Sequence, residues 1–526
     1  SSAASDVYKR QTMNNSNLIK IVAPMLTSIL SCSKPSEEIV INHPKEVRST
    51  PNILFVIADD QSFPHCSAYG NSFVKTPAFD YIASQGCLFQ NAYVTSPGSS
   101  PSRASILSGM YPWQIKEAGT HCSYFPKDIV CYTDILTANG YNVGYTGKGW
   151  APGDCKERGV NPAGKAFNKK KLTPPYSGIS NIDYVENFKL FYQDSDKKQP
   201  FCFWVGFNEP HRGFERDSWQ KENKSLSIVS VPGFLPNHDV VKGDLLDYSV
   251  EIEYQDAQLQ KIIDFLKEKG LFDNTLIIVT ADNGMAFPNA KATCYDAGVH
   301  VPLAICWGDK IKRKNTSEIV SSVDFAPTML DAAGINRSSY GHMSGKSMLP
   351  FLMENKEQKR EAVYFGRERH SSSRYANLGY PIRSLRKGNY LYIRNFHPER
   401  WPAGDPTPLD KNNNLAKAHS GYFDIDGSPT KQFFINNREN GDGVQYFIRT
   451  VGFRPYEELY NIENDPCCLD NCIEKPEYKG VLSELRGRLD QLLYQTNDVR
   501  VTSEKGDSIW ESYPRIDSIR NFPPYE

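Results

Sequence analysis

The sequence lacks the features that mark several broad classes of protein. Its 60 Lys and Arg residues are balanced by 61 Asp and Glu residues, so no excess charge draws the chain to nucleic acid or to an anionic membrane. Cysteine is sparse, 12 of 526 residues, and no paired CxxC motifs provide a zinc framework. Since 39% of the residues are hydrophobic, the chain can still bury a large core, which excludes a wholly disordered protein.

Long apolar runs are also missing. The run at 21–30 is too short to cross a bilayer, which takes about 20 apolar residues, and no other segment is long and apolar enough. The segment from Met13 to Cys32 resembles a bacterial lipoprotein signal with Cys32 as the lipid acceptor. We therefore expect an exported protein, in the periplasm or tethered to the outer membrane by a lipid anchor. The alternative is a disordered N-terminal tail, and residues 1–12 are expected to be a non-native lead.

Short apolar runs alternate with helical patterns along most of the chain. Residues 52–58 (NILFVIA) are typical of a strand buried on both faces, and further strands are predicted at 142–146, 201–207, 275–280 and 301–307. Over 245–269, apolar residues recur at three- and four-residue steps, which predicts a helix. This alternation predicts an α/β fold with a large, mostly parallel sheet that is flanked by helices on both faces.

The sequence pattern changes after about residue 360. Residues 383–395 alternate like a solvent-faced antiparallel strand, and 411–440 are polar and loop-like. We therefore expect a smaller C-terminal α+β subdomain with an antiparallel sheet, which contributes to the substrate pocket. The predicted divisions are a lead, signal and linker at 1–49, a catalytic domain at 50–360 and a C-terminal subdomain at 361–526.

Hard or charged side chains follow three of the predicted strands. They are Asp59-Asp60, the segment 208–212 (NEPHR) and Asp282-Asn283. Ligands of open α/β sheets gather at the carboxyl ends of the strands, and adjacent aspartates repel each other unless a cation or hydrogen-bond donors hold them. Oxygen-only ligands suit Ca²⁺ or Mg²⁺ rather than zinc. The pattern predicts a divalent-cation site, with helix capping or a turn as the alternative for Asp59-Asp60 alone.

The segment 96–109, SPGSSPSRASILSG, carries the most specific motif. From Ser99 through Arg103 to Gly109 it resembles the signature [C/S]-x-P-S-R-x-x-x-x-[TS]-G of the formylglycine-dependent sulfatases. A proline in a first helical turn is also an ordinary helix start, so the order of flanking landmarks matters. Gly147-Lys148, Pro210-His211 and Asp282-Asn283-Gly284 follow in sulfatase order.

The resemblance covers nearly the whole chain and is strongest to the sulfamidase branch, the N-sulfoglucosamine sulfohydrolases. It rests on 208–212, on the spacing from Asp282 to Lys291, on Arg369-His370 and on 380–384. It implies an alkaline-phosphatase-like fold and removal of sulfate from a sulfated oligosaccharide, preferably the glucosamine N-sulfate of heparin or heparan sulfate. Serine at 99 resembles the bacterial variant that a radical-type maturation enzyme oxidises to formylglycine.

The oxidation of Ser99 has a chemical reason. A plain serine that attacked sulfur would remain as a stable sulfate ester, whereas an aldehyde hydrate attacks with one oxygen and expels sulfate with the other. A metal lowers the pKa of the hydrate and draws charge from the sulfate. The resemblance implies one divalent cation, Ca²⁺ in preference to Mg²⁺, with the ligands Asp59, Asp60, Ser99, Asp282 and Asn283.

Four further residues complete the expected catalytic set. Arg103, at i+4 from residue 99, can reach back to hold the hydrate. Lys148 and Lys291 are expected to clamp the sulfate oxygens, although a lysine is more often a solvated surface residue. His211 is the expected general acid for the leaving group, because imidazole changes charge near neutral pH; the alternative is a buried, structural histidine.

One position departs from the family pattern. Many sulfatases carry Lys-x-His where this chain has Lys148-Gly149-Trp150, so His121, His300 or His370 replaces the missing histidine or the step is handled differently. Trp150 either stacks on a sugar or packs in the core or a lid. His370, Arg374 and Arg383 would suit an acidic sugar neighbour such as a uronate or another sulfate, with an ordinary polar surface as the alternative. The residues expected to contact substrate are His121, Trp150, Arg212, His300, His370, Arg374 and Arg383.

Other activities stay open at this point. They are a carbohydrate O-sulfatase such as a 6-O-sulfatase, a phospho- or phosphonate-ester hydrolase of the same fold, and an inactive binder of sulfated glycan if Ser99 is not oxidised. A serine esterase is excluded, because no G-x-S-x-G elbow surrounds Ser99.

Overall fold

A large sheet organises the described part of the chain, which in the computed structural model comprises residues 50–354, 356 and 360–525. Its eight strands lie in the order β10-β2-β9-β8-β1-β7-β4-β6. Their bounds are β1 (Asn52–Ala58), β2 (Cys87–Tyr93), β4 (Asn142–Gly147), β6 (Lys165–Ala166), β7 (Phe201–Gly206), β8 (Thr275–Ala281), β9 (His300–Cys306) and β10 (Lys314–Ser321). Within this sheet only β9 runs antiparallel to its neighbours, so the prediction of a mostly parallel sheet is confirmed.

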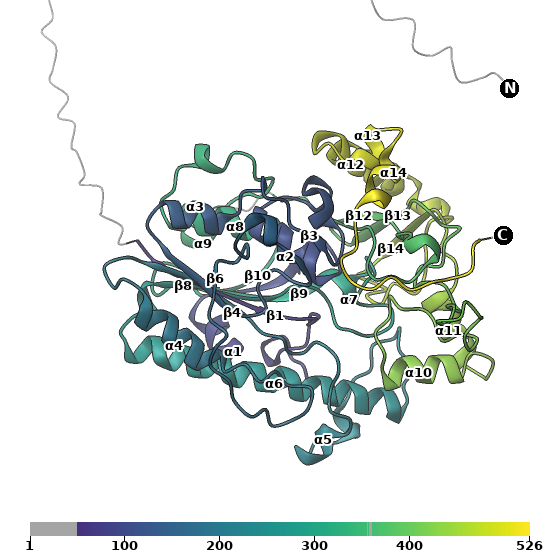
Figure 1. Ribbon diagram of the computed structural model, residues 1–526, viewed down its shortest axis with the longest axis horizontal. Coiled ribbons are helices and arrows are strands. Elements are labelled where there is room, and N and C mark those ends of the chain that lie inside the picture. Colours follow the sequence, from purple (N-terminus) through teal and green to yellow (C-terminus); the bar gives the residue numbers. More distant parts are fainter. Residues whose placement is uncertain (1–49, 355, 357–359, 526) are drawn as a thin grey trace, which may run out of the picture. The chain divides into compact units, whose positions relative to one another are not determined.

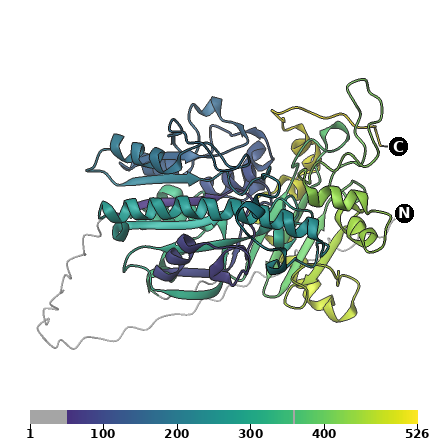
Figure 2. The ribbon, with the colours of Figure 1, turned by 90° about the horizontal axis from the view of Figure 1, so that it is seen from below.

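Helices cover both faces of this sheet. Along β1, Ile53, Phe55 and Ile57 point to one face and Leu54 and Val56 to the other, and all five are buried. The first face packs against α2 (Ser99–Ser108), α3 (Tyr132–Ala138), α8 (Phe325–Ala332) and α9 (Leu349–Glu354). The second packs against α1 (Pro77–Gln85), α4 (Tyr184–Asp194) and α6 (Asp239–Glu268) (Figure 1). Figure 2 shows α6 running along the sheet; it begins earlier than the predicted 245.

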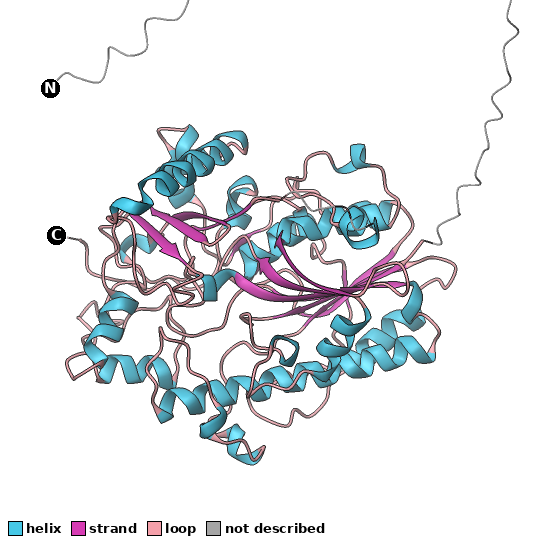
Figure 3. Ribbon diagram, turned by 180° about the vertical axis from the view of Figure 1, so that it is seen from behind, coloured by secondary structure: helices cyan, strands magenta, loops and turns pink. Residues whose placement is uncertain are grey.

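A second sheet is antiparallel and lies apart from the first (Figure 3). Its strands, in spatial order, are β11 (Ala362–Arg367), β12 (Ile382–Lys387), β13 (Tyr390–Asn395) and β14 (Glu457–Asn461). The prediction of a single solvent-faced strand at 383–395 is wrong: a turn at Gly388, with a φ of +54°, divides the segment into a hairpin. One face of it is buried, because α12 (Lys479–Gln495) packs there through Leu482, Leu485, Leu489 and Leu493.

The remaining elements are short. Helix α10 (Pro429–Asn436) interrupts the predicted loop at 411–440, with a cap in which the Ser428 side chain accepts from the Lys431 amide. The others are β3 (Ser123–Tyr124), β5 (Gly153–Asp154), α5 (Ser218–Lys221), α7 (Asp296–Val299), α11 (Gly443–Val451), α13 (Val499–Thr502) and α14 (Gly506–Ser512). None of the helices described is both long and apolar enough to cross a membrane.

Two predictions concern the organisation of the chain. The predicted boundary between 360 and 361 falls just before β11, the first strand of the small sheet, and stays a prediction as a division into domains. The proposed signal and lipid-accepting Cys32 lie outside the described residues. The cysteines that the structure describes, among them Cys467, Cys468 and Cys472, are all free thiols.

Candidate active site

Four neighbouring parallel strands end at one edge of the large sheet. In the order β8, β1, β7, β4 they are followed by Asp282-Asn283, Asp59-Asp60, the segment 208–212 and Lys148. Because the carboxyl ends of parallel strands face the same way, residues that are far apart in the sequence lie side by side there.

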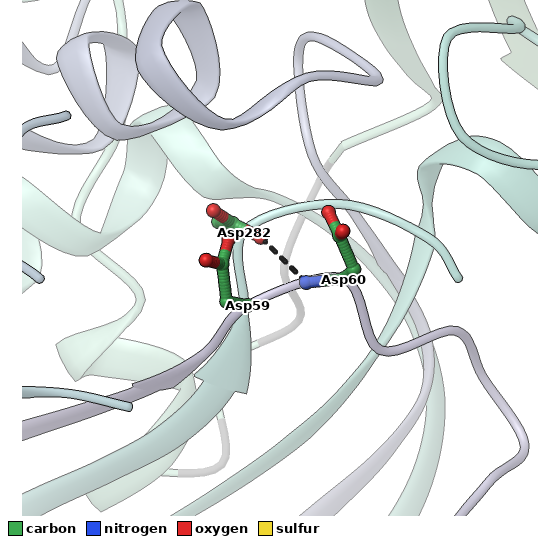
Figure 4. Close-up of side chains that lie close together, drawn as sticks. All are labelled: Asp59, Asp60 and Asp282. Carbon is green, nitrogen blue, oxygen red and sulfur yellow. Dashed lines mark hydrogen bonds between the residues drawn. The ribbon is translucent and has the colours of Figure 1, made fainter. Parts of the chain in front are cut away.

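Three carboxylates form a compact group at this edge. Asp59, Asp60 and Asp282 each offer an oxygen within 4.8 Å of the others, and their side chains are at most 2% exposed. Figure 4 shows the three carboxyl groups on the same side of the two strand ends, with the Asp60 amide donating to Asp282 Oδ1 at 3.0 Å. Asn283 adds an amide group, which donates to Asp60 Oδ1 at 2.8 Å. Asp60 has a φ of +71°, a strained conformation that often marks functional sites.

Helix α2 brings Ser99 and Arg103 against these carboxylates. Ser99 is the first helical residue, 1% exposed, and its hydroxyl donates to Asp59 Oδ1 at 2.9 Å. Arg103 Nε donates to Asp282 Oδ2 at 2.7 Å, and its Nη2 lies 3.5 Å from Asp59 Oδ1. This buried Nη2 has no hydrogen-bond partner among the described residues, so it remains available as a donor to a ligand. We call Asp59, Asp60, Ser99, Arg103, Asp282 and Asn283 the floor of the site.

Two lysines balance the charge of the floor. Lys148 Nζ lies 2.6 Å from Asp59 Oδ2, and Lys291 Nζ lies 2.7 Å from Asp60 Oδ2. Burial would raise the pKa of Asp59, but Lys148 and Arg103 hold it well below its usual value. For Asp282, burial and the neighbouring carboxylates outweigh Arg103 and raise the pKa to about 6.

The donor set of the floor fits a hard divalent cation. Three carboxylates and one amide are oxygen donors of the kind that Ca²⁺ and Mg²⁺ prefer, and the hydroxyl of Ser99 lies beside them. The raised pKa of Asp282 reflects first its burial and then its repulsion by Asp59 and Asp60, and a bound cation would oppose both effects.

Two side chains form the exposed rim of the site. His211 is 40% exposed, and its Nε2 lies 3.8 Å from Asp60 Oδ2. Its Nδ1 lies 2.6 Å from the Arg212 carbonyl, so Nδ1 carries the hydrogen and Nε2 faces the floor. Asp426 is 31% exposed, and its Oδ2 lies 3.1 Å from Lys291 Nζ. Sequence reasoning missed Asp426, because one aspartate in a polar loop carries no spacing signal.

The three candidate substitutes for the missing histidine lie in different surroundings. The rings of His121 and His370 are 4.6 Å apart, and His370 Nδ1 lies 3.0 Å from the position that a Cβ on Gly98 would take. Burial lowers the pKa of His370 to about 3, so its ring is neutral. His300 instead stacks on Phe63, and both of its nitrogens have partners. His121 and His370 therefore border the turn before Ser99, whereas His300 belongs to the packing of the sheet.

The structure corrects two predicted substrate contacts close to the floor. Trp150 is 2% exposed, and its Nε1 donates to the Ser100 carbonyl at 2.9 Å, so it packs in the core rather than on a sugar. Arg212 pairs with both oxygens of Asp244, at 2.7 and 2.8 Å, and its guanidinium lies over two phenylalanine rings. Both side chains make structural contacts, so neither is free to bind substrate.

The same correction applies to two arginines of the C-terminal part. Arg374 is fully buried and lies 2.7 Å from Asp424 Oδ2. Arg383 is 1% exposed and pairs with Glu368 and Asp498. Each guanidinium has carboxylate partners inside the protein, so neither presents a free cation to an acidic sugar.

Comparisons with known proteins agree with this geometry. A family model described as Sulfatase matches residues 51–335, and one described as N-sulphoglucosamine sulphohydrolase, C-terminal, matches residues 289–402. An ulvan-active sulfatase of Formosa agariphila is 26% identical over 532 residues, which covers 94% of this chain and 83% of the relative. Human N-sulphoglucosamine sulphohydrolase is 26% identical over 507 residues, which covers 89% of this chain and 95% of the relative.

A solved structure shows the same fold. It is the structure of another protein in complex with its substrate, D-glucosamine-2-N,6-O-disulfate. The two structures superimpose with a TM-score of 0.61 at 19% identity, and the match covers 87% of this chain and 100% of the other. The prediction of an alkaline-phosphatase-like α/β fold with a second, antiparallel sheet is confirmed.

Proposed function

The chain belongs to the sulfatase family, and we propose that it removes the N-linked sulfate from glucosamine residues of heparin or heparan sulfate. It is a sulfuric ester hydrolase of the sulfamidase-like type, and sulfated glycans are its substrate class. One observation carries the choice of the N-linked sulfate. The part that matches the N-sulphoglucosamine sulphohydrolase C-terminal model, 289–402, supplies Lys291, which contacts Asp60 of the floor, and His370, which borders the turn before Ser99.

Ser99 is the proposed nucleophile after its oxidation by a radical-type maturation enzyme. Formylglycine supplies a hydrated aldehyde, whose two oxygens allow attack on sulfur and later release of sulfate. The position of Ser99 supports this role, because its hydroxyl donates to Asp59 Oδ1 at 2.9 Å, which places its oxygen beside the proposed cation ligands. Arg103 Nη2, the unpartnered donor of the floor, is placed to hold the oxygens on residue 99.

Asp59, Asp60, Asp282 and Asn283, with residue 99, are the proposed ligands of one divalent cation, with Ca²⁺ preferred. Such a cation supplies positive charge to the sulfate and lowers the pKa of the nucleophile. Lys148 and Lys291 flank the carboxylates from two sides, and we assign them to the sulfate oxygens that need fixed positive charge.

His211 is the proposed general acid. Cleavage of a sulfamate expels an amine, which must gain a proton as it leaves. His211 is the exposed imidazole of the rim, and its Nε2 faces the floor while Nδ1 is fixed by a backbone carbonyl. This arrangement holds a proton donor at the side from which a saccharide arrives.

The alternative within the family is a carbohydrate O-sulfatase. A relative described as an N-acetylglucosamine-6-O-sulfatase of Bacteroides thetaiotaomicron favours it, because that protein is 24% identical over 524 residues, which covers 79% of this chain and 90% of the relative. The residues of the floor suit cleavage of an N-linked sulfate as well as of an O-linked sulfate. The choice between the two activities therefore depends on the leaving group and on the sugar.

A panel of sulfated saccharides tests the proposal. We expect sulfate release, followed by chromatography, to be faster from N-sulfated glucosamine than from 6-O-sulfated N-acetylglucosamine. Active protein should carry a residue 99 about two mass units lighter than serine, and Ser99→Ala should reduce turnover to background. The reverse preference would favour the O-sulfatase, and full activity of unmodified serine would exclude the formylglycine mechanism.

Export with lipid attachment at Cys32 is proposed on the sequence alone, since residues 1–49 are not described. Membrane fractionation of cells that produce the full chain should find the protein with the membrane, and Cys32→Ala should release it. A soluble cytoplasmic wild-type protein would contradict this proposal.

A further inference from the structure

Asp426 differs from every carboxylate of the floor in its exposure. Asp59, Asp60 and Asp282 are at most 2% exposed, whereas the side chain of Asp426 is 31% exposed. It belongs to the C-terminal part of the chain, yet it lies 3.1 Å from Lys291, which also contacts Asp60. Asp426 is thus the acidic group that an arriving substrate can touch.

The loop that carries Asp426 is fixed on both sides. Two residues earlier, Asp424 is buried and accepts hydrogen bonds from Arg367, Arg374, Ser371 and Ser373. Two residues later, Ser428 caps helix α10. Lys431 of that helix donates to the carbonyls of Gly421, Tyr422 and Ile425. Such anchoring presents the carboxylate in one orientation, as a binding group requires.

The surroundings of Asp426 leave it ionised and partly unpaired. Burial would raise the pKa of Asp426, but the charge of Lys291 outweighs it and lowers the pKa to about 2. Within the described residues, Lys291 is the only cation within ion-pair distance, and no backbone or hydroxyl group donates to the side chain. Oδ2 is buried beside Lys291, so the oxygen that is open to a ligand is Oδ1, with about two acceptor sites.

The part of a ligand that such a group selects carries hydrogen-bond donors and no negative charge. A carboxylate accepts hydrogen bonds from hydroxyl groups and repels a second anion. We propose that Asp426 binds the sugar itself, accepting hydrogen bonds from hydroxyl groups next to the sulfated position. It thereby selects saccharides whose neighbouring positions are free hydroxyls and rejects those that are sulfated there. This inference rests on the proposed function and names a specificity determinant for it.

Kinetics with two kinds of substrate test the proposal. Asp426→Asn should lower kcat/KM by about 10- to 100-fold on the sugar sulfate that the wild type cleaves best, mainly through KM, because hydrogen bonds to an ionised group are lost. On 4-nitrophenyl sulfate, which has no sugar hydroxyls, the change should stay within about twofold. Asp442→Asn, which changes an exposed carboxylate on the same part of the chain, should alter neither rate.

Two results would overturn the proposal. An equal loss on both substrates would mean that Asp426 acts only by positioning Lys291, and no loss on either would remove it from the site. A wild type that cleaves O-sulfated but not N-sulfated sugar would contradict the proposed function alone, because the same ratio can be measured on the O-sulfated sugar.

A binding measurement covers the case in which turnover is absent. In the Ser99→Ala background, calorimetry should show that Asp426→Asn weakens binding of the sulfated sugar by about 10- to 100-fold but does not weaken binding of inorganic sulfate. An N-sulfated glucosamine that is also sulfated on the adjacent hydroxyl should bind poorly to the Ser99→Ala protein and better after Asp426→Asn. Equal weakening of sugar and sulfate would refute the role.

Discussion

Charge is balanced residue by residue in this site. Its four carboxylates face three permanent cations: the carboxylates are Asp59, Asp60, Asp282 and Asp426, and the cations are Arg103, Lys148 and Lys291. A divalent cation would turn the resulting charge of −1 into +1, which one sulfate monoanion neutralises. This arithmetic favours a singly charged sulfate or sulfamate over a phosphate monoester with two charges.

Loss of His211 should lower the catalytic rate without changing the formylglycine or metal content of the site. We expect His211→Ala to lower the rate on N-sulfated glucosamine by about 10²- to 10⁴-fold, the usual contribution of a general acid. The floor does not depend on it, so formylglycine content by mass analysis and metal content by elemental analysis should be unchanged.

A matched control for this variant is His342→Ala, which removes an exposed histidine that lies near the carbonyl of Val130. Its activity should equal that of the wild type. A negligible effect of His211→Ala would move the acid role to His121 or His370, the histidines that border the turn before Ser99.

Glu251 is a buried acid on α6 that the site does not use. It is 2% exposed, its Oε2 has no hydrogen-bond partner among the described residues, and burial together with Glu209 and Asp247 raises its pKa to about 9. Its protonated form is favoured in the folded state, so this contribution to stability is complete below about pH 4.5 and is lost as the pH rises toward 9.

We therefore expect Glu251→Gln to be more stable than the wild type at pH 8 by about 1–3 kcal/mol, since each pKa unit corresponds to about 1.4 kcal/mol. In thermal denaturation, the difference in melting temperature should grow between pH 5 and pH 9. Glu474→Gln, at an exposed glutamate, should show no such trend. A destabilised Glu251→Gln at pH 8 would mean that the carboxylate is ionised and paired.

At the scale of elements, apolar patterning located the strands that form the site. The predicted strands agree with β1, β4, β7, β8 and β9 within one residue at each end, because a strand buried on both faces reads as one apolar run between polar residues. Strands β2 and β10 at the far side of the sheet were not predicted. In β10, partly buried residues alternate with exposed ones and most of them are polar. Residues 314–321 therefore contain no apolar run that would indicate a strand.

Long-range pairing explains the other misses. Arg374 and Arg383 were predicted to contact substrate, because the sequence cannot show that Asp424 and Asp498 neutralise them in the fold. Asp426 was missed for the converse reason: only the packing of its loop brings it to Lys291. The motif residues of the floor were found because their order along the chain follows the order of strand ends.

The loop before α10 gives a prediction about stability. Burial would raise the pKa of Asp424, but Arg374 and Arg367 outweigh it and hold the pKa far below its usual value. Asp424→Asn leaves two buried guanidinium groups without their carboxylate and should cost about 3–5 kcal/mol at pH 7. This stabilisation is complete above about pH 4 and is lost as the pH falls below that value.

Thermal denaturation of wild type and Asp424→Asn checks this directly. Their melting temperatures should differ at pH 7 and converge in more acidic solution, whereas Asp442→Asn should melt like the wild type throughout. Coinciding melting curves at pH 7 would show that the arginines find other partners and that the loop does not need Asp424.

At the scale of the whole molecule, the two sheets contribute different parts of the site. Strand ends of the large sheet and helix α2 supply the floor, while segments associated with the small sheet bring His370 to the turn before Ser99 and Asp426 to Lys291. Chemistry common to a family can therefore stay on the large sheet, and the choice of sugar can change in loops of the C-terminal part.

Removal of the proposed cation should affect the stability of the whole molecule as well as the reaction. Without it, three buried carboxylates share one edge of the large sheet, so chelation should abolish sulfate release and lower the melting temperature. Ca²⁺ or Mg²⁺ should restore both more effectively than a thiophilic metal does, because the donors are oxygen atoms. At 100 times the dissociation constant, binding stabilises the fold by about 2.7 kcal/mol. Asp282→Asn should lose this shift, whereas Asp442→Asn should keep it; an unchanged shift in Asp282→Asn would place the cation elsewhere.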